Sequence, residues 1–137
     1  MARTGLRLVG DEILRERTDQ QNTIRALLRD AQRGSGAVVL VEGEPGIGKS
    51  ALLRAASGEA VGFGFSVATG TADQLSQQIP LHALRMALPE PFSGYEVSGS
   101  ADPFDNTIRW IGRLRAHLEE RAAENPVLVC LDDLQWA

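Results

Sequence analysis

Cysteine, lysine and long apolar segments are all scarce in this chain of 137 residues. The one cysteine, Cys130, excludes an internal disulfide, and with only two histidines beside it a zinc site of the usual kind cannot be built. No apolar run exceeds a handful of residues, whereas a membrane-spanning helix needs about 20. Residues 1–10 lack the apolar stretch of a signal peptide. We therefore expect a cytoplasmic protein without membrane contact.

The length of the chain allows at most one domain. Its composition, with 43% hydrophobic and 23% charged residues, is that of a folded protein. The net charge of −4 offers no general attraction to nucleic acid. Thirteen of the fourteen basic residues are arginine, and the exception is Lys49. Because lysine is avoided everywhere else, we infer that the chemistry at position 49 requires it.

The spacing of apolar and breaker residues predicts strands that alternate with helices. Helices are predicted at residues 19–33, 49–60, 81–88 and 104–124, and strands at 37–41, 62–70 and 127–131. Residues 5–15 show no clear period, and 71–80 and 89–103 are predicted to be loops. The unbroken apolar strands 37–41 and 127–131 predict burial on both faces. This order of elements indicates an α/β fold with a parallel sheet.

The helix predicted at 104–124 carries one strongly charged face. We expect this face to be solvated rather than to bind nucleic acid; its residues are Arg109, Arg113, Arg115, Glu119 and Glu120.

The segment between the strand at 37–41 and the helix at 49–60 matches the phosphate-binding pattern G-x-x-x-x-G-K-[ST] in full. Its residues are Gly43, Glu44, Pro45, Gly46, Ile47, Gly48, Lys49 and Ser50. Glycines let consecutive N–H groups converge on one anion, at the positive end of the following helix. We expect Lys49 to reach the β- and γ-phosphates and the Ser50 hydroxyl to bind Mg²⁺. A glycine turn that binds nothing is the plainer alternative, which the strand–turn–helix context disfavours.

The apolar strand at 127–131 is followed by two acids, Asp132 and Asp133. In a parallel sheet ligands bind at the carboxyl ends of the strands, so we expect these acids and the phosphate loop to face one crevice. Asp132 is then placed to hold Mg²⁺, through water, and Asp133 to orient or deprotonate an attacking water. The alternative is that the pair only caps a helix.

Both motifs resemble those of the AAA-type ATPase module in large ATP-binding LuxR-family transcriptional regulators, which belong with the STAND signalling ATPases. Residues 39–53 and 131–137 carry the resemblance, and residues 79–81 are similar to the region between the motifs. It implies a P-loop NTPase fold, a three-layer sandwich with a mostly parallel sheet, that binds ATP and Mg²⁺. The N-terminus departs from the family pattern, because Asp11 and Glu12 follow the Val-Gly pair where an arginine and an acid are usual.

The resemblance also assigns roles to individual residues. ATP would be bound by residues 43–51, which end at Ala51. Lys49 and Asp133 would be catalytic, and Ser50 and Asp132 would be the metal ligands.

The same resemblance implies that residues 1–137 are the N-terminal part of one ATPase domain, truncated after the Walker B strand. Residues 1–36 would be a leading segment and helix, and 37–137 the nucleotide-binding core. A further strand would follow residue 137, so we expect the isolated chain to be marginally stable and to hydrolyse ATP poorly. DNA would be contacted only by a C-terminal domain absent from this chain, and homo-oligomerisation of the full-length protein is left open.

Two functions remain open. The first is the nucleotide switch of a transcriptional regulator, with Mg-ATP binding and slow hydrolysis. The second is a phosphotransferase that passes the γ-phosphate to a small molecule. Small kinases often place acceptor-binding residues after the second strand, here residues 71–103, and that region has no cluster of arginines. The first function is therefore favoured.

Overall fold

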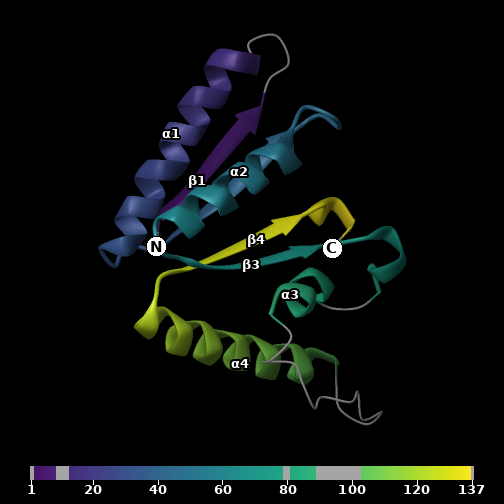
Figure 1. Ribbon diagram of the computed structural model, residues 1–137. Helices are drawn as coiled ribbons and strands as arrows, with labels where there is room; N and C mark the ends of the chain where they lie inside the picture. Colours follow the sequence, from purple (N-terminus) through teal and green to yellow (C-terminus); the bar gives the residue numbers. More distant parts are fainter. Residues whose placement is uncertain (1, 9–12, 79–80, 89–102, 137) are drawn as a thin grey trace. The chain divides into compact units, whose positions relative to one another are not determined.

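The computed structural model describes residues 2–8, 13–78, 81–88 and 103–136. The chain forms two compact units, Met1–Phe65 and Ser66–Ala137. Each unit contains one pair of parallel strands together with helices (Figure 1). The α/β class with parallel strands that the sequence predicts is thus confirmed.

Among the described helices, none has the length and apolar character that a membrane span requires.

The sheet of the first unit pairs β1 (Ala2–Leu8) with β2 (Ala37–Gly43), in register from Ala2↔Ala37 to Leu8↔Gly43. β1 overlaps the segment 5–15, which shows no clear period, and its pairing with a strand 35 residues later is a tertiary contact. β2 is the predicted strand, extended to Gly43. Its residues alternate between half-buried and exposed, with Val38 and Leu40 at 50% and 51% exposure. The prediction that both faces are buried is wrong, because one side of the strand remains open.

Two helices complete this unit, α1 (Ile13–Gln32) and α2 (Lys49–Gly62). α1 begins earlier than the predicted 19–33. The Thr23 hydroxyl donates to the Asp19 carbonyl at 2.9 Å, a bond made four residues back within a helix. Thr23 and Asp19 are therefore interior residues of α1.

Polar contacts tie α1 to the C-terminal half of α2. Arg25 Nε donates to Glu59 Oε2 at 2.7 Å, and Gln32 Nε2 donates to the carbonyl of Phe63 at 2.6 Å. The Arg29 guanidinium lies 5.9 Å from the centroid of the Phe63 ring. Among the residues of this unit whose burial is described, the buried apolar ones are Ile24, Leu28, Leu52, Ala56, Ala60 and Phe65. The helix that carries the phosphate loop is therefore anchored at its far end.

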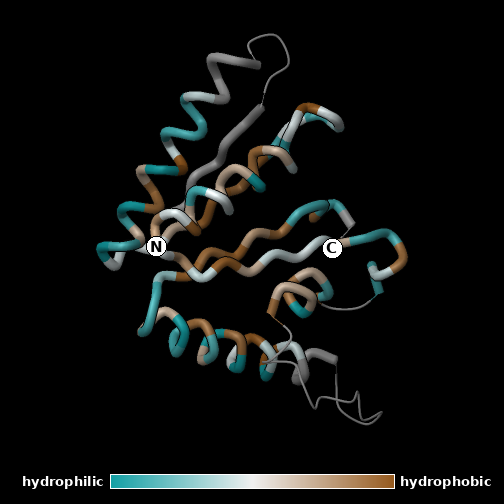
Figure 2. The backbone as a smooth tube through the Cα atoms, viewed as in Figure 1, coloured by the Kyte–Doolittle hydropathy of each residue, from teal (hydrophilic) through white to brown (hydrophobic). Residues whose placement is uncertain are grey.

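The sheet of the second unit pairs β3 (Ser66–Thr71) with β4 (Val127–Asp132), in register from Ser66↔Val127 to Thr71↔Asp132. β3 starts later than the predicted 62–70, because Gly62 ends α2 and Gly64 turns the chain at φ 84°. β4 is hydrophobic along most of its length and polar where it ends (Figure 2). The two acids therefore stand at the carboxyl end of a strand, as predicted.

A short helix, α3 (His82–Ala87), lies against β3 at Gly70. A Cβ atom at Gly70 would collide with the Ala83 carbonyl oxygen and would approach the Cβ of Ala87 to 3.1 Å. The absence of a side chain at Gly70 therefore sets how closely this helix packs on the strand.

The other helices in the described residues are η2 (Gln74–Ser76), α4 (Pro103–Glu124) and η4 (Leu134–Trp136). η2 falls within the predicted loop 71–80. Of the predicted loop 89–103, residues 89–102 lie outside the described residues and Pro103 begins α4. Trp110 of α4 is buried, and the Arg85 guanidinium of α3 lies 5.3 Å from the centroid of its ring.

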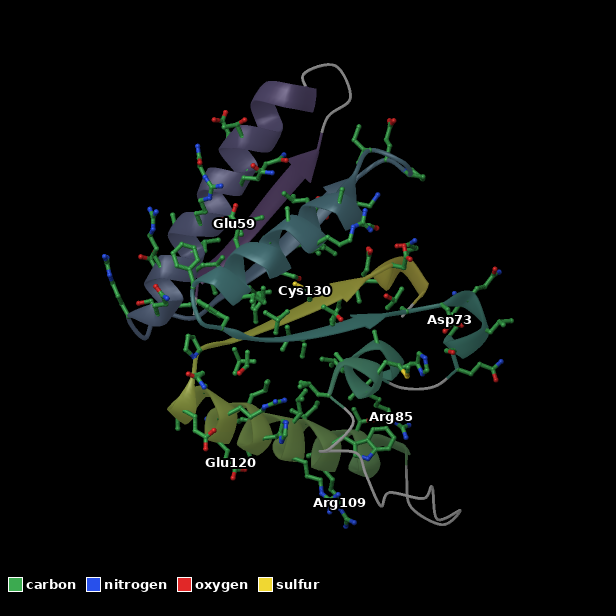
Figure 3. The ribbon with its side chains drawn as sticks, in the orientation of Figure 1. Glu59, Asp73, Arg85, Arg109, Glu120 and Cys130 are labelled. Carbon is green, nitrogen blue, oxygen red and sulfur yellow. The ribbon has the colours of Figure 1, made fainter. Side chains whose placement is uncertain are left out.

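The charged face of α4 is solvated, as predicted. Arg109 and Glu120 project away from the rest of their unit in Figure 3, and both are exposed. Arg115 and Glu119, four residues apart, form an ion pair at 2.8 Å with side chains 79% and 65% exposed. Such a pair contributes little to stability.

Candidate functional site

The phosphate loop connects the last residue of β2, Gly43, to the first residue of α2, Lys49. Two of its glycines have left-handed backbone angles: φ is 80° at Gly46 and 107° at Gly48. The N–H of Ile47 donates to the Glu44 carbonyl at 3.2 Å, which closes a turn inside the loop. A side chain at either glycine would strain the backbone, so the pattern of glycines follows from the conformation.

Lys49 is half-buried, and its side chain folds back over the loop. Nζ donates to the carbonyl oxygen of Gly43 at 2.6 Å and to that of Glu44 at 3.0 Å. The ammonium is thus held where the loop begins by two neutral acceptors. A phosphate oxygen, which carries negative charge, is a stronger acceptor for the same group.

Gly48 is the N-cap of α2, and the first bond within the helix runs from the N–H of Leu52 to the Gly48 carbonyl at 3.0 Å. Helix geometry leaves the preceding N–H groups, those of Lys49, Ser50 and Ala51, without an intrahelical acceptor. Together with the positive end of the helix dipole they favour an anion at this point.

The other half of the predicted site lies at the end of β4. Asp132 is the last residue of the strand and is half-buried, and its carbonyl accepts a hydrogen bond of 3.0 Å from the Ala72 N–H. Asp133 is exposed and has a left-handed φ of 55°. Its N–H donates to Oδ1 of Asp132 at 2.9 Å. One oxygen of the Asp132 carboxylate is therefore fixed by the backbone, which orients the other.

The two halves of the site belong to different units. The loop residues and Lys49 lie in the unit Met1–Phe65, and the two acids lie in the unit Ser66–Ala137. Within each unit the predicted residues are brought together. Their convergence on one nucleotide, across both units, stays a prediction.

The chemistry of the candidate metal ligands fits Mg²⁺. Ser50 offers a hydroxyl oxygen from the first turn of α2, and Asp132 offers a carboxylate oxygen. Mg²⁺ prefers such oxygen ligands and is usually bound by one or two carboxylates, waters and phosphate oxygens. These residues are suitable for the ion that accompanies a nucleoside triphosphate.

One side chain near the acids makes a contact that no sequence motif predicts. Gln135, in η4, donates from Nε2 to Oδ1 of Asp133 at 3.3 Å. In the sequence this contact corresponds only to a glutamine two residues after an acid. That spacing indicates a contact only when Asp133 is known to adopt a left-handed conformation. Cys130, in contrast, is buried within β4, as expected for a small apolar residue (Figure 3).

A second polar cluster follows β3, in the predicted loop. Asp73 accepts hydrogen bonds from the Ser76 N–H at 2.9 Å and from the Ser76 hydroxyl at 2.8 Å, and His82 Nε2 lies 3.6 Å from its Oδ2. The hydroxyl bond is the largest of the causes that lower the pKa of Asp73 below its ordinary value of 3.8. Asp73 is the N-cap of η2, so this cluster has a structural explanation.

The model of a protein family described as the AAA ATPase domain matches residues 14–137. The match begins near the start of α1 and includes both the phosphate loop and the two acids. Searches of curated proteins and of solved structures found no match. Because the matched segment covers most of the sequence, and the phosphate loop has the geometry that its motif requires, the chain belongs to the AAA ATPase domain family.

Proposed function

We propose that this chain binds Mg-ATP and hydrolyses it slowly. The observation that carries the proposal is the phosphate loop itself. Left-handed angles at Gly46 and Gly48 open the loop, and the ammonium of Lys49 is already held over it. A loop, a helix N-terminus and one cation in this order form a site for a polyphosphate.

On binding, the phosphates accept hydrogen bonds from the N–H groups at the start of α2, which helix geometry leaves without an intrahelical acceptor. Lys49 exchanges the carbonyls of Gly43 and Glu44 for β- and γ-phosphate oxygens, which are better acceptors. Mg²⁺ would be held by the Ser50 hydroxyl and, through water, by Asp132. The ion, when bound, neutralises charge on the phosphate oxygens.

Asp133 acts on the water that attacks the γ-phosphate. Its exposed carboxylate accepts a proton of this water and so aligns the water oxygen with the phosphorus. In the hydrolysis, the water oxygen forms a bond to the γ-phosphorus while the bond from that phosphorus to the β,γ-bridging oxygen breaks. The products are ADP and inorganic phosphate, and the proton leaves through the carboxylate.

We further propose that the domain is the nucleotide switch of a LuxR-family transcriptional regulator of the STAND type. The resemblance of residues 39–53 and 131–137 to that group supports this assignment. In such a cytoplasmic protein, DNA would be bound by a separate C-terminal domain, and self-association would be a property of the full-length protein. The match to an ATPase family supports hydrolysis over the alternative of phosphoryl transfer to a small molecule.

The binding step is tested by titrating Mg-ATP into the chain by calorimetry. We expect saturable binding to the wild type and binding about 10- to 100-fold weaker to Lys49→Ala, because a charge-assisted hydrogen bond is lost. Arg54→Ala removes an exposed cation from the same helix and is the matched control, with affinity expected within about twofold of wild type. Equal affinity of all three proteins would contradict the proposed site.

The turnover step is tested by following phosphate release with excess Mg-ATP. Asp133→Asn should bind Mg-ATP normally and release phosphate at least about tenfold more slowly, as expected for loss of a general base.

In the full-length protein, the regulatory role predicts that DNA affinity differs between the ATP and ADP states. The same DNA affinity in both states would contradict that role.

A further inference from the structure

A side-chain contact spans the residues that follow β4. Asp133 has a φ of 55°, and its N–H is bonded to the carboxylate of Asp132. The following turn, η4, returns the side chain of Gln135 to Asp133. The distance from Gln135 Nε2 to Asp133 Oδ1 is 3.3 Å.

Folding alone gives little reason for this contact. Both side chains are exposed, and a hydrogen bond between exposed side chains adds little to stability because water replaces it readily. The backbone of Asp133, moreover, is in a region that costs free energy for a residue other than glycine. Such strain is more often found at functional sites than elsewhere.

We propose that Gln135 is a positioning residue for Asp133. Its amide N–H holds Oδ1, which limits rotation of the carboxylate and leaves Oδ2 to accept the proton of the attacking water. The carboxylate of Asp132 is oriented in the same way by the N–H of Asp133. The residues that follow β4 therefore orient the carboxylates of both acids. This inference rests on the proposed ATP hydrolysis and adds to it the residue that sets the geometry of the base.

The test is a double-mutant cycle on phosphate release by the full chain. Gln135→Leu keeps the size of the side chain and removes the donor. We expect its kcat to fall about fivefold, the effect of one modest hydrogen bond, with KM for Mg-ATP within about twofold of wild type. In the Asp133→Asn background the same change should have no further effect, because a positioning residue acts only through its partner.

Two further variants test whether the fall in kcat is specific to the contact between Gln135 and Asp133. Gln78→Leu makes the same chemical change at an exposed position elsewhere in this unit and should leave kcat and Tm unchanged. Gln135→Glu keeps the length of the side chain and repels Asp133. It should lower kcat at least as much as Gln135→Leu, and it serves as the test if the leucine variant does not fold.

Several outcomes would overturn the inference while the proposed function stands. The first is an unchanged kcat for both Gln135 variants. The second is an equal fall in kcat when Gln135→Leu is made in the Asp133→Asn background. The third is a fall in kcat that is accompanied by a lower Tm or a higher KM. Binding of Mg-ATP without any phosphate release from the wild type would overturn both the inference and the hydrolysis. Absence of Mg-ATP binding to the wild type would instead show that the proposed function is wrong from its first step.

Discussion

Lys49, the first residue of α2, donates a hydrogen bond of 2.6 Å to the carbonyl oxygen of Gly43, the last residue of β2. The two ends of the phosphate loop are therefore joined by the side chain that is expected to bind the nucleotide. Closing the loop and binding phosphate are distinct roles of one ammonium, and substitutions can separate them.

Lys49→Arg is expected to keep the first role and lose most of the second. A guanidinium can still donate to the loop carbonyls, so the free energy of unfolding should stay within about 0.5 kcal/mol of wild type, whereas Lys49→Ala should lose about 1 kcal/mol. Both variants should bind Mg-ATP more weakly, since a planar fork replaces the compact charge poorly. Urea unfolding and calorimetric titration measure the two quantities. An arginine variant with wild-type affinity would show that the point charge is not required.

Gly48→Ala should destabilise the protein by about 1–2 kcal/mol, because φ at this position is 107° and a Cβ atom disfavours that region. Gly58, within the same helix, is the matched control. A Cβ there meets no atom of the described residues within 4 Å, so Gly58→Ala should stabilise the protein by about 0.5–1 kcal/mol. Urea unfolding measures the change in the free energy of unfolding for both variants. A change of the same sign in both would contradict the left-handed conformation of Gly48.

Gly70→Ala should destabilise the second unit, because the added methyl group collides with the backbone of Ala83. Overpacking of this kind typically costs about 1–3 kcal/mol. Gly112→Ala, in α4, adds a methyl group that meets no atom within 4 Å in the described part of the chain, and it serves as the control. Thermal unfolding should show a lower Tm for the first variant only. An unchanged Tm for Gly70→Ala would mean that α3 does not lie closely against β3.

The stability of the protein should depend on the ionisation of Asp73 in acid. Hydrogen bonds from Ser76 lower its pKa in the folded state, so the charged carboxylate stabilises the fold above its ordinary pKa of 3.8. That contribution is lost as the pH falls through the lowered value. The free energy of unfolding of the wild type should therefore fall more steeply below about pH 4 than that of Asp73→Asn.

The cause of this pKa shift is tested separately. In Ser76→Ala the largest contribution is removed, so the pKa of Asp73, followed by NMR titration of its carboxyl carbon, should rise toward 3.8. A pKa that does not move would assign the effect to the backbone N–H groups or to His82 instead.

Local patterns predicted most of the elements, because periodic apolar residues and breakers act over short distances. α2, α3, α4 and β4 lie close to their predicted positions. The errors have non-local causes. β1, with two arginines and a glycine, is a strand because it pairs with β2, and Val38 and Leu40 are exposed although they belong to an unbroken apolar run.

The candidate site divides in the same way. The phosphate loop could be predicted because its eight consecutive residues carry the whole requirement: glycines for the left-handed turns, a lysine and the start of a helix. The contact between Gln135 and Asp133 could not, since it depends on one backbone angle at the end of β4.

By itself, the sequence determined that this is an α/β protein with a phosphate loop, because that information lies in contiguous residues whose conformations are chosen locally. Only the tertiary structure decided which strands pair, which face of β2 stays open and how closely α3 approaches Gly70. These features arise when segments distant in the chain meet. Their free energy comes from burial and ladder hydrogen bonds that no local pattern specifies.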